Sequence, residues 1–356
     1  MPKDIPKQRI GDGMKKYLIS NEGSFYKACL HCHTTVSDGH LSPEELKAAY
    51  KSLGYSIVAF TDHDVMIPHP ELRDADFIPM TAVELDIGNK SPDKTMANGD
   101  CVHFNFIALD ENMEIQPLWH REKYVPPKAL HSKPLVKFDE NEPDYERAYT
   151  PECVNDMMRI GREKNFFVIY NHPTWSHESY NEYIKYENMH AMEIINNISN
   201  TGCGVFEYND RVYDDMLRSG KRLFCVAADD AHALYPLGKR KCDIGGTWTM
   251  IKAKAFDYPS VADALLRGDF YASEGPVLNS IWYEDGKICV ECEPCDRVIF
   301  TSYPKRGMAY YDETGDGLTY AELPLEENHK IVRVTLVDKY GKRAYTSAYF
   351  ADEFKK

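Results

Sequence analysis

Fold and chemistry both follow from the stretch Cys29-Leu30-His31-Cys32-His33-Thr34-Thr35-Val36-Ser37-Asp38-Gly39. The apolar residues 24–30 predict a short strand that runs into His31. Alternate residues of an extended chain point to the same side, so the imidazoles of His31 and His33 can reach one metal ion. The alternative is a pair of surface histidines at a strand end. Recurrence of the pattern elsewhere in the chain decides between the two.

The pattern of a short apolar strand that ends at a histidine or a carboxylate recurs along the chain. Further strands are expected at 56–60, 77–83, 101–109, 165–170, 191–195 and 222–228. They lead to His63, Glu84, His172 and the Asp230-Ala231-His232 segment, and one carries His103 near its start. Helices fit between several of them, including one that starts at Ser42-Pro43-Glu44-Glu45. Seven such strands predict a parallel α/β barrel or sheet with its site at the carboxyl ends of the strands.

Imidazoles and carboxylates are the side chains that this edge of the sheet would gather. The candidate ligands are His31, His33, Asp38, His63, Glu84, His103, His172, Asp230 and His232. Such ligands suit zinc, manganese and iron. Nine ligands exceed the needs of one ion, so we expect two or three divalent transition-metal ions as cofactors.

These motifs, in this order, resemble those of the PHP (polymerase and histidinol phosphatase) superfamily over roughly residues 24–275. The resemblance implies a distorted seven-stranded (β/α) barrel with a trinuclear metal site. One ion would be held by His31, His33, Glu84 and Asp230. Glu84 would bridge to a second ion bound by His103 and His172, and the third would be held by Asp38, His63 and His232. Glu84 and Asp230 would thus be the catalytic carboxylates.

The chain divides into three expected parts. Residues 1–23 form an N-terminal extension, and residues 24–275 form the barrel, with a polar, proline-rich insertion at about 110–149. From 276 to 356 alternating strands and turns predict a small β-sandwich. This last part is similar to the small β-domain of PHP hydrolases of the CehA/McbA type.

Composition and charge restrict the partners and the compartment. A net charge of −14 repels polyanions, so we expect a small-molecule substrate and no nucleic-acid polymer. No apolar run reaches the length of a membrane span, and the N-terminus lacks the apolar core of a signal peptide. We therefore expect a cytoplasmic protein without a membrane partner. The ten cysteines are scattered, which favours reduced thiols over disulfides or a thiolate zinc site. The oligomeric state stays open.

Two groups of residues close to the motifs could contact the substrate. His177 and Trp175 follow His172 and could line the pocket, and their alternative is an ordinary loop role. Lys239 and Arg240 lie in a basic run just after His232 and could meet a phosphate group, although the pattern favours a solvated basic loop over this role.

The resemblance favours a metal-dependent phosphoesterase, in which a metal-bridging hydroxide at the trinuclear site attacks a small phosphate ester. A carbamate or amide hydrolase that uses the same metal site is the enzymatic alternative. A non-catalytic, metal-stabilised binding protein is a third possibility, and the complete set of ligands disfavours it.

Overall fold

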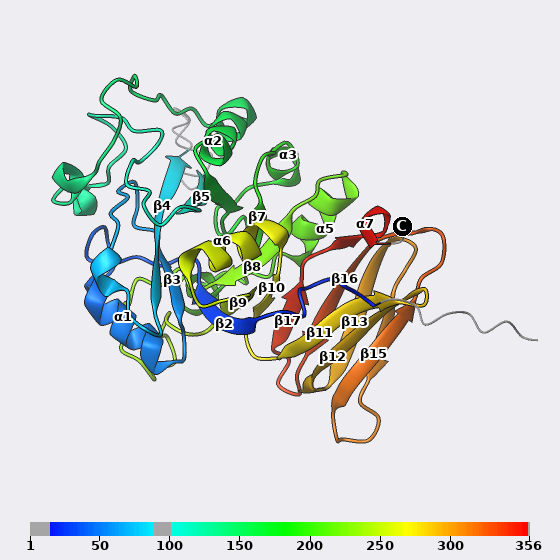
Figure 1. Cartoon of the computed structure of the whole chain (residues 1–356). Helices are drawn as coiled ribbons and strands as arrows, with labels where there is room; N and C mark the ends of the chain where they lie inside the picture. Colours follow the sequence, from blue (N-terminus) through cyan, green and yellow to red (C-terminus); the bar gives the residue numbers. More distant parts are fainter. Residues whose placement is uncertain (1–14, 89–100, 355–356) are drawn as a thin grey trace, which may run out of the picture.

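The computed structural model describes residues 15–88 and 101–354. An α/β part and a β-rich part lie side by side, with the β-rich part built mainly from the C-terminal third of the chain (Figure 1). The expected N-terminal extension falls partly outside the described residues. Its described end contains β1 (Lys16–Tyr17), which pairs with the β-rich part.

Strands and helices alternate through most of the α/β part. The strands are β2 (Ser24–Cys29), β3 (Ile57–Phe60), β4 (Ile78–Gly88), β5 (Cys101–Ala108), β6 (Phe166–Tyr170), β7 (Ala191–Asn196), β8 (Phe224–Ala228), β9 (Trp248–Ala253) and β10 (Phe270–Ser273). The helices are α1 (Pro43–Ser52), α2 (Pro151–Glu163), α3 (Tyr180–Tyr183), α4 (Asn197–Thr201), α5 (Asp210–Arg218) and α6 (Tyr258–Arg267), with a 3-10 turn at Pro70–Leu72.

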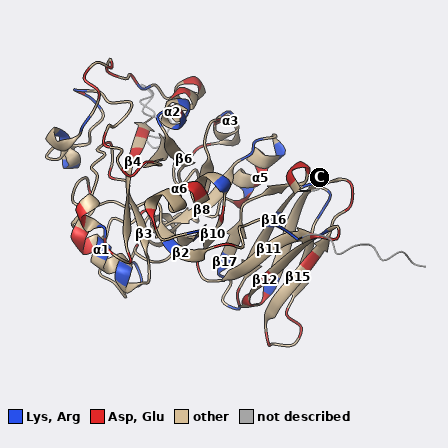
Figure 2. Ribbon diagram, in the orientation of Figure 1, with Lys and Arg blue, Asp and Glu red and all other residues tan. Residues whose placement is uncertain are grey.

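Local sequence explains where the first helix begins. Ser42 caps α1 in a capping box with Glu45, and Pro43 occupies the first turn, as the sequence predicts. Acidic residues stand in its first turn and Lys51 in its last, which matches the helix dipole (Figure 2). Leu46, Ala49 and Tyr50 are buried, so this face anchors α1 to the sheet.

The sheet is mixed, which corrects the expectation of parallel strands. β2, β3 and β4 are parallel, as are β6, β7 and β8, but β5 is antiparallel to both of its neighbours. β9 is antiparallel to β2 and is a strand that sequence reasoning missed. Because β5 runs backwards, its start lies at the edge where the parallel strands end. His103, near that start, therefore joins the residues that follow the other strands.

Pairing in the α/β part runs from β10 through β9 and β2 to β8, and β8 also meets β9 through side chains. Thr249 Oγ1 donates to Ala227 O (2.9 Å) and accepts from Ala227 N (3.1 Å), while Thr247 Oγ1 donates to Ala228 O (2.6 Å). Within the described residues no backbone ladder joins β8 to β9. The chain is an α/β protein, and the closed seven-stranded barrel stays a prediction.

The β-rich part contains two sheets around a separate apolar core. Its elements are β11 (Leu278–Glu284), β12 (Lys287–Cys295), β13 (Arg297–Pro304), β14 (Met308–Tyr311), β15 (Leu318–Pro324), β16 (His329–Val337), β17 (Arg343–Thr346), β18 (Tyr349–Phe350) and α7 (Ala351–Phe354). One sheet has the order β1-β11-β12-β15, and the other continues the α/β sheet because β17 pairs with β10. A division at residue 275 thus crosses a continuous sheet, and the domain boundaries remain a prediction.

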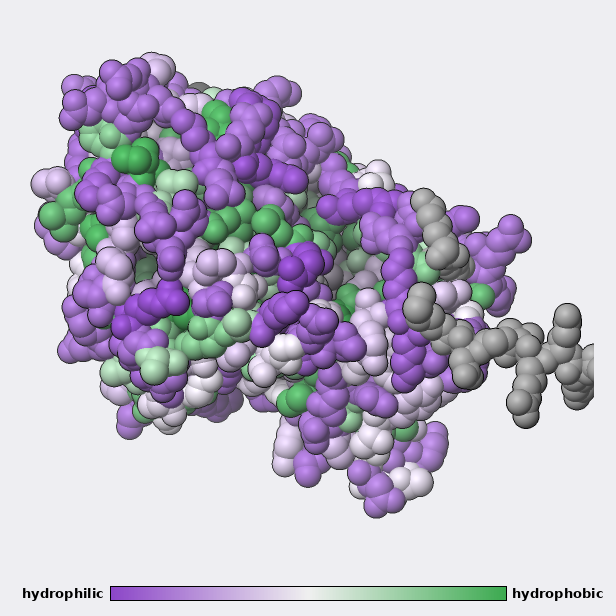
Figure 3. Space-filling view, viewed as in Figure 1, coloured by the Kyte–Doolittle hydropathy of each residue, from purple (hydrophilic) through white to green (hydrophobic). Residues whose placement is uncertain are grey.

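The expected insertion at 110–149 contains no strand and only two 3-10 turns, at Pro127–Ala129 and Lys133–Leu135. Its Trp119 and Val136 are buried in a small apolar cluster together with Val65, which lies outside the insertion. The face seen in Figure 3 is mostly hydrophilic, with small hydrophobic patches between hydrophilic residues. Among the described helices, none is long and apolar enough to cross a membrane.

Candidate metal centre

The first two ligand candidates follow β2 in a segment that one carboxylate holds in place. Asp62 accepts hydrogen bonds from Thr34 N and Thr34 Oγ1 (both 2.8 Å) and from Ser37 N (3.1 Å) and Ser37 Oγ (2.6 Å). Asp62 is itself buried just after β3. These bonds fix the loop that leads from His33 to Asp38, so two strand ends position one side of the site together.

Glu84 lies at the centre of the cluster, inside β4 and not at a strand end as the sequence suggests. Its Oε1 faces His103 Nδ1 (3.1 Å), His31 Nε2 (3.2 Å) and His172 Nε2 (3.3 Å). Its Oε2 faces a second set, His63 Nδ1 (3.1 Å) and His33 Nε2 (3.2 Å). The two oxygens of this buried carboxylate therefore serve different groups of imidazoles.

Asp230 completes the inner part of the cluster from the segment after β8. Its Oδ1 lies 3.1 Å from His33 Nε2 and 3.2 Å from His31 Nε2, and its Oδ2 lies 3.8 Å from His172 Nε2. Asn196 donates to Oδ2 from the end of β7 (3.2 Å). The backbone of Asp230 has a positive φ of 51°, an uncommon conformation that aspartate adopts more readily than most residues.

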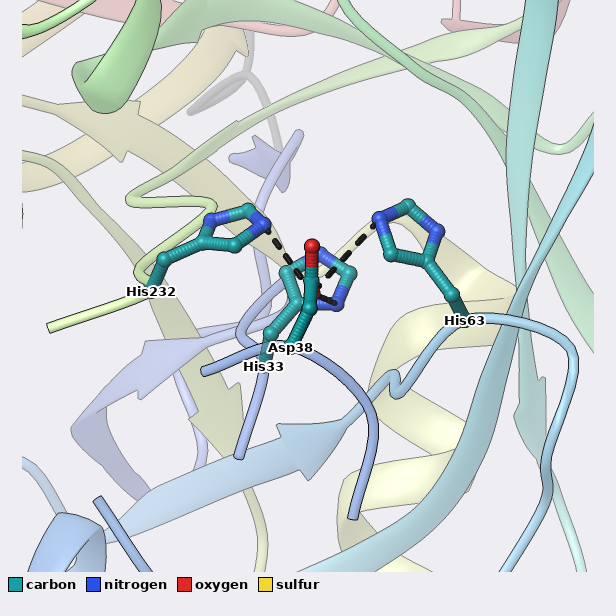
Figure 4. A group of neighbouring side chains, drawn as sticks. All are labelled: His33, Asp38, His63 and His232. Carbon is teal, nitrogen blue, oxygen red and sulfur yellow. Dashed lines mark ion pairs between the residues drawn. The ribbon is translucent and has the colours of Figure 1, made fainter. Parts of the chain in front are cut away.

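Asp38 gathers three imidazoles at the open side of the cluster (Figure 4). Its Oδ1 lies 3.3 Å from His232 Nε2, 3.8 Å from His33 Nδ1 and 3.9 Å from His63 Nε2. The side chains of Asp38, His63 and His232 are 17–24% exposed, whereas those of His31, His33 and Glu84 are at most 1% exposed. The Asp38 side is therefore the more exposed side of the cluster.

Three overlapping groups of ligand atoms could each hold an ion. They are His31, His33, Glu84 and Asp230; His63, Glu84 and His103; and His33, Asp38, His63 and His232. The first group is the set expected for one ion. The second contains His63 where the resemblance implies His172, although His172 Nε2 also faces Glu84. The third group adds His33 to the expected set. In this group His33 Nδ1 lies 3.8 Å from Asp38 Oδ1, whereas in the first group His33 Nε2 lies 3.1 Å from Asp230 Oδ1.

The charges of the cluster oppose one another strongly. Burial lowers the pKa of His31, but the carboxylates of Asp230 and Glu84 outweigh burial and raise this pKa well above its usual value. Burial raises the pKa of Glu84, yet the surrounding imidazoles, chiefly His31 and His103, hold it well below its usual value. Burial and the charge of His33 lower the pKa of His63 to about 3. The carboxylates thus stay ionised and require positive charge nearby.

The arrangement fits divalent cations better than hydrogen bonds. Glu84 Oε2 and His33 Nδ1 are buried without a hydrogen-bond partner in the described part of the chain. The two Nε2 atoms of His31 and His33 face each other at 3.2 Å, where two protons would clash. Neutral imidazole nitrogens and carboxylate oxygens that converge in this way suit zinc, manganese or iron. The cysteines are free thiols, and none belongs to the three groups.

Glu193 and Asn171 support the ligands, and sequence reasoning gave neither a role. Glu193 Oε1 lies 2.7 Å from His31 Nδ1, and its Oε2 accepts from His172 N (3.0 Å). Asn171 Nδ2 donates to Glu84 Oε1 (2.8 Å). Partners of this kind orient metal ligands. One feature of the sequence could have identified Glu193: it lies inside the apolar run Ala191-Met192-Glu193-Ile194-Ile195. A buried strand rarely accommodates an unpaired carboxylate, so this position indicates a partner.

The candidate substrate residues follow the ligand candidates His172 and His232 in the chain. His177 is exposed, and its backbone N–H bonds to Thr174 O (3.2 Å). Lys239 and Arg240 are exposed in the loop between His232 and Asp243. No ion pair involving either cation occurs among the described residues. Their contact with a substrate remains a prediction.

Comparison with known proteins gives one family and several solved structures. The PHP domain model matches residues 30–231. A two-domain protein from Bacteroides vulgatus, which contains a predicted PHP-like metal-dependent phosphoesterase, is 15% identical with a TM-score of 0.42, over 97% of this chain and 100% of that chain. No curated protein matches.

Two further structures cover only part of this chain. A candidate metal-dependent phosphoesterase from Bifidobacterium adolescentis is 15% identical with a TM-score of 0.37, over 62% of this chain and 92% of that one. An amidohydrolase from Chromobacterium violaceum with bound sulfate is 14% identical with a TM-score of 0.37, over 58% and 87%. The match to the family model spans more than half of the 356 residues, and the chain therefore belongs to the PHP domain family.

Proposed function

We propose that this chain is a metal-dependent phosphoesterase that hydrolyses a small phosphate ester. The position of Glu84 carries the proposal, because its two oxygens face two different sets of imidazoles. A carboxylate can bridge two cations in this position, whereas each neutral imidazole binds one. Bound divalent ions would supply an acidified water and neutralise charge on phosphoryl oxygens.

The residues of the chain divide the work between them. His31, His33 and Asp230 would hold one ion with Glu84, and His103 and His172 would hold the second. For the third ion, Asp38, His63 and His232 stand at the exposed side, where a phosphate ester would arrive. His33 fits the first ion better, because its Nε2 contacts are shorter than its 3.8 Å Nδ1 contact with Asp38.

Lys239 and Arg240 follow His232 and would attract the anionic substrate toward this exposed side. In a chain of net charge −14, cations without a carboxylate partner in the described residues are well suited to this role. The cytoplasmic location and the absence of a polymeric or membrane partner remain part of the proposal.

The test is turnover by protein reconstituted with manganese, zinc or iron. Phosphate monoesters and diesters, carbamate esters and amides would be offered in parallel, with metal content measured by elemental analysis. We expect more than one metal equivalent per chain and phosphate release from at least one ester. Carbamate turnover without phosphate release would favour the alternative hydrolase. Metal binding without any turnover would favour a binding protein.

A further inference from the structure

We propose that Trp175 forms the wall of a subsite that receives an aromatic group on the alcohol side of the phosphate ester. This inference rests on the proposed function and adds the substrate class to it. Trp175 lies three residues after the ligand candidate His172, in a turn that leads away from the cluster.

The indole of Trp175 packs against the cluster itself. Its ring centroid lies 4.9 Å from that of His172, at 79° between the planes, and 5.5 Å from that of His103, at 59°. Trp175 is only half-buried. It also belongs to none of the apolar clusters found among the described residues. A tryptophan that only fills the core would pack against aliphatic side chains, so this position points to contact with a ligand.

Hydrogen bonds hold the turn that carries Trp175. Buried Glu207 accepts from Thr174 N (2.9 Å) and from Trp175 N (2.6 Å). Asn209 Nδ2 donates to Glu207 Oε1 (2.7 Å), and Thr174 Oγ1 donates to Asn209 Oδ1 (2.7 Å). The backbone that carries the indole is therefore held in place before substrate binds, which lowers the entropic cost of using Trp175 as a binding surface.

The segment that holds this turn carries a second aromatic residue. Phe206 precedes Glu207 and is 84% exposed, the largest exposure of any large apolar side chain in the described residues. The carboxylate of Glu207 ties the two segments together, so Phe206 and Trp175 stand on adjoining segments. Aromatic groups stack on such rings with offset or edge geometry, and this distinguishes an aromatic alcohol from a small aliphatic one.

The test compares benzyl phosphate with ethyl phosphate. Both are esters of primary alcohols, so the two leaving groups are alike and the comparison isolates binding of the organic part. We expect the metal-reconstituted protein to show about tenfold higher kcat/KM for benzyl phosphate, the scale of one aromatic contact. Trp175→Ala should lower kcat/KM for benzyl phosphate more than for ethyl phosphate, and Trp175→Phe should retain part of the preference.

Tyr340→Ala is the matched control, because Tyr340 is an exposed aromatic residue in the remote turn between β16 and β17. It should leave both esters unchanged. Metal content of each Trp175 variant shows whether His172 and His103 still bind. The subsite is overturned if the unaltered protein does not discriminate, or if Trp175→Ala lowers both esters equally.

Binding separates failure of the subsite from failure of the proposed function. Benzylphosphonate and ethylphosphonate cannot be hydrolysed and would be titrated by calorimetry. If neither ester turns over but benzylphosphonate binds more tightly in a Trp175-dependent way, the phosphoesterase proposal fails and the subsite stands. If both phosphonates bind equally, the subsite fails whatever the activity.

Discussion

Two dense groups of charged side chains lie in this molecule, and they differ in what balances the charge of their carboxylates. Where α5 meets β16, Arg333 Nε and Nη2 donate to the two oxygens of Asp214 (2.8 and 3.0 Å). Asp210 accepts from Tyr345 OH (3.0 Å) and lies 3.5 Å from Arg343 Nη1. Each carboxylate of this junction has a guanidinium partner from the protein.

The metal centre has no such partner. Glu84, Asp230 and Asp38 face imidazoles, with neutral amide donors from Asn171 and Asn196, and no lysine or arginine pairs with these carboxylates among the described residues. Buried atoms there also stay without hydrogen bonds, including Glu84 Oε2. A buried charge without a partner is costly, so a group that the protein leaves incomplete is one that a ligand completes. The comparison predicts that substitutions at the junction cost stability and those at the centre cost function.

Glu84→Gln should give the largest effect. The amide keeps the size of the side chain but removes the charge shared by the two imidazole sets. We expect turnover to fall by more than about 100-fold, above the range for residues that only support ligands. Metal content should fall with it. The measurements are turnover and elemental analysis after reconstitution.

His63→Asn is the comparison for Glu84→Gln. From the sequence, His63 belongs only to the third ion. In the structure its Nδ1 lies 3.1 Å from Glu84 Oε2, so its loss should disturb the centre as well. We still expect a smaller loss than for Glu84→Gln, because the charge of Glu84 remains. Near-normal activity of Glu84→Gln would reject its bridging role.

Arg333→Met tests the other group. The guanidinium is buried, and its loss leaves Asp214 with an unpaired charge at the junction. We expect the free energy of unfolding to fall by about 3 kcal/mol, measured by urea denaturation. Metal content per folded molecule should not change. Adding Asp214→Leu should recover part of the loss, and no recovery would show that the charge is not the cause.

Glu193→Gln should have an intermediate effect on the centre. Glu193 orients His31 through Nδ1 at 2.7 Å but faces no ion itself. We expect metal affinity to fall about 10- to 100-fold with little change in unfolding. Glu187→Gln is the control, since Glu187 is exposed and lies 3.9 Å from Lys221. Equal metal affinity of the two variants would remove Glu193 from the centre.

Much of the site could be predicted because its signals are local. The strand before His31 and the capping box of α1 depend on neighbouring residues, and both occur in the structure. His103 was an exception, because the sequence places it near the start of a strand whereas the other candidate ligands follow the ends of strands. Reversal of β5 explains it, but strand direction depends on pairing between distant segments, which one sequence does not specify.

The remaining features depend on contacts that are distant along the chain. β1 pairs with β11 and β10 pairs with β17, so both expected boundaries of the α/β part are crossed by hydrogen bonds. Neither β1 nor β10 has a sequence pattern that predicts which strand it pairs with. Glu193 was missed because its role comes from His31, 162 residues away. A buried carboxylate in an apolar run signals a partner without identifying it.

We expect the smallest effect, a change in the pH dependence of stability, at His190. This histidine lies outside the metal centre, and the protein backbone satisfies its ring nitrogen. It precedes β7, its Nδ1 accepts from Val168 N (3.0 Å), and its ring stacks on Phe167 at 4.9 Å. Burial, together with the charge of Arg162, lowers its pKa to about 4. The unfolded chain, with a histidine pKa of about 6.5, therefore binds a proton before the folded chain does. Stability from this group is present above pH 6.5 and is lost as the pH falls toward 4.

For His190 we expect the free energy of unfolding to fall by about 1 kcal/mol between pH 7 and 5.5, and this part of the slope should disappear in His190→Gln. His40→Gln, at an exposed histidine, should keep the slope of the unaltered protein. Urea denaturation across this pH range measures the free energy of unfolding of both variants. The difference between each variant and the unaltered protein gives the contribution of that one histidine. Nearby carboxylates raise the pKa of His31, His33 and His103, so these three histidines favour the opposite slope. If His190→Gln leaves the slope intact, the acid sensitivity does not arise at this backbone-bonded imidazole.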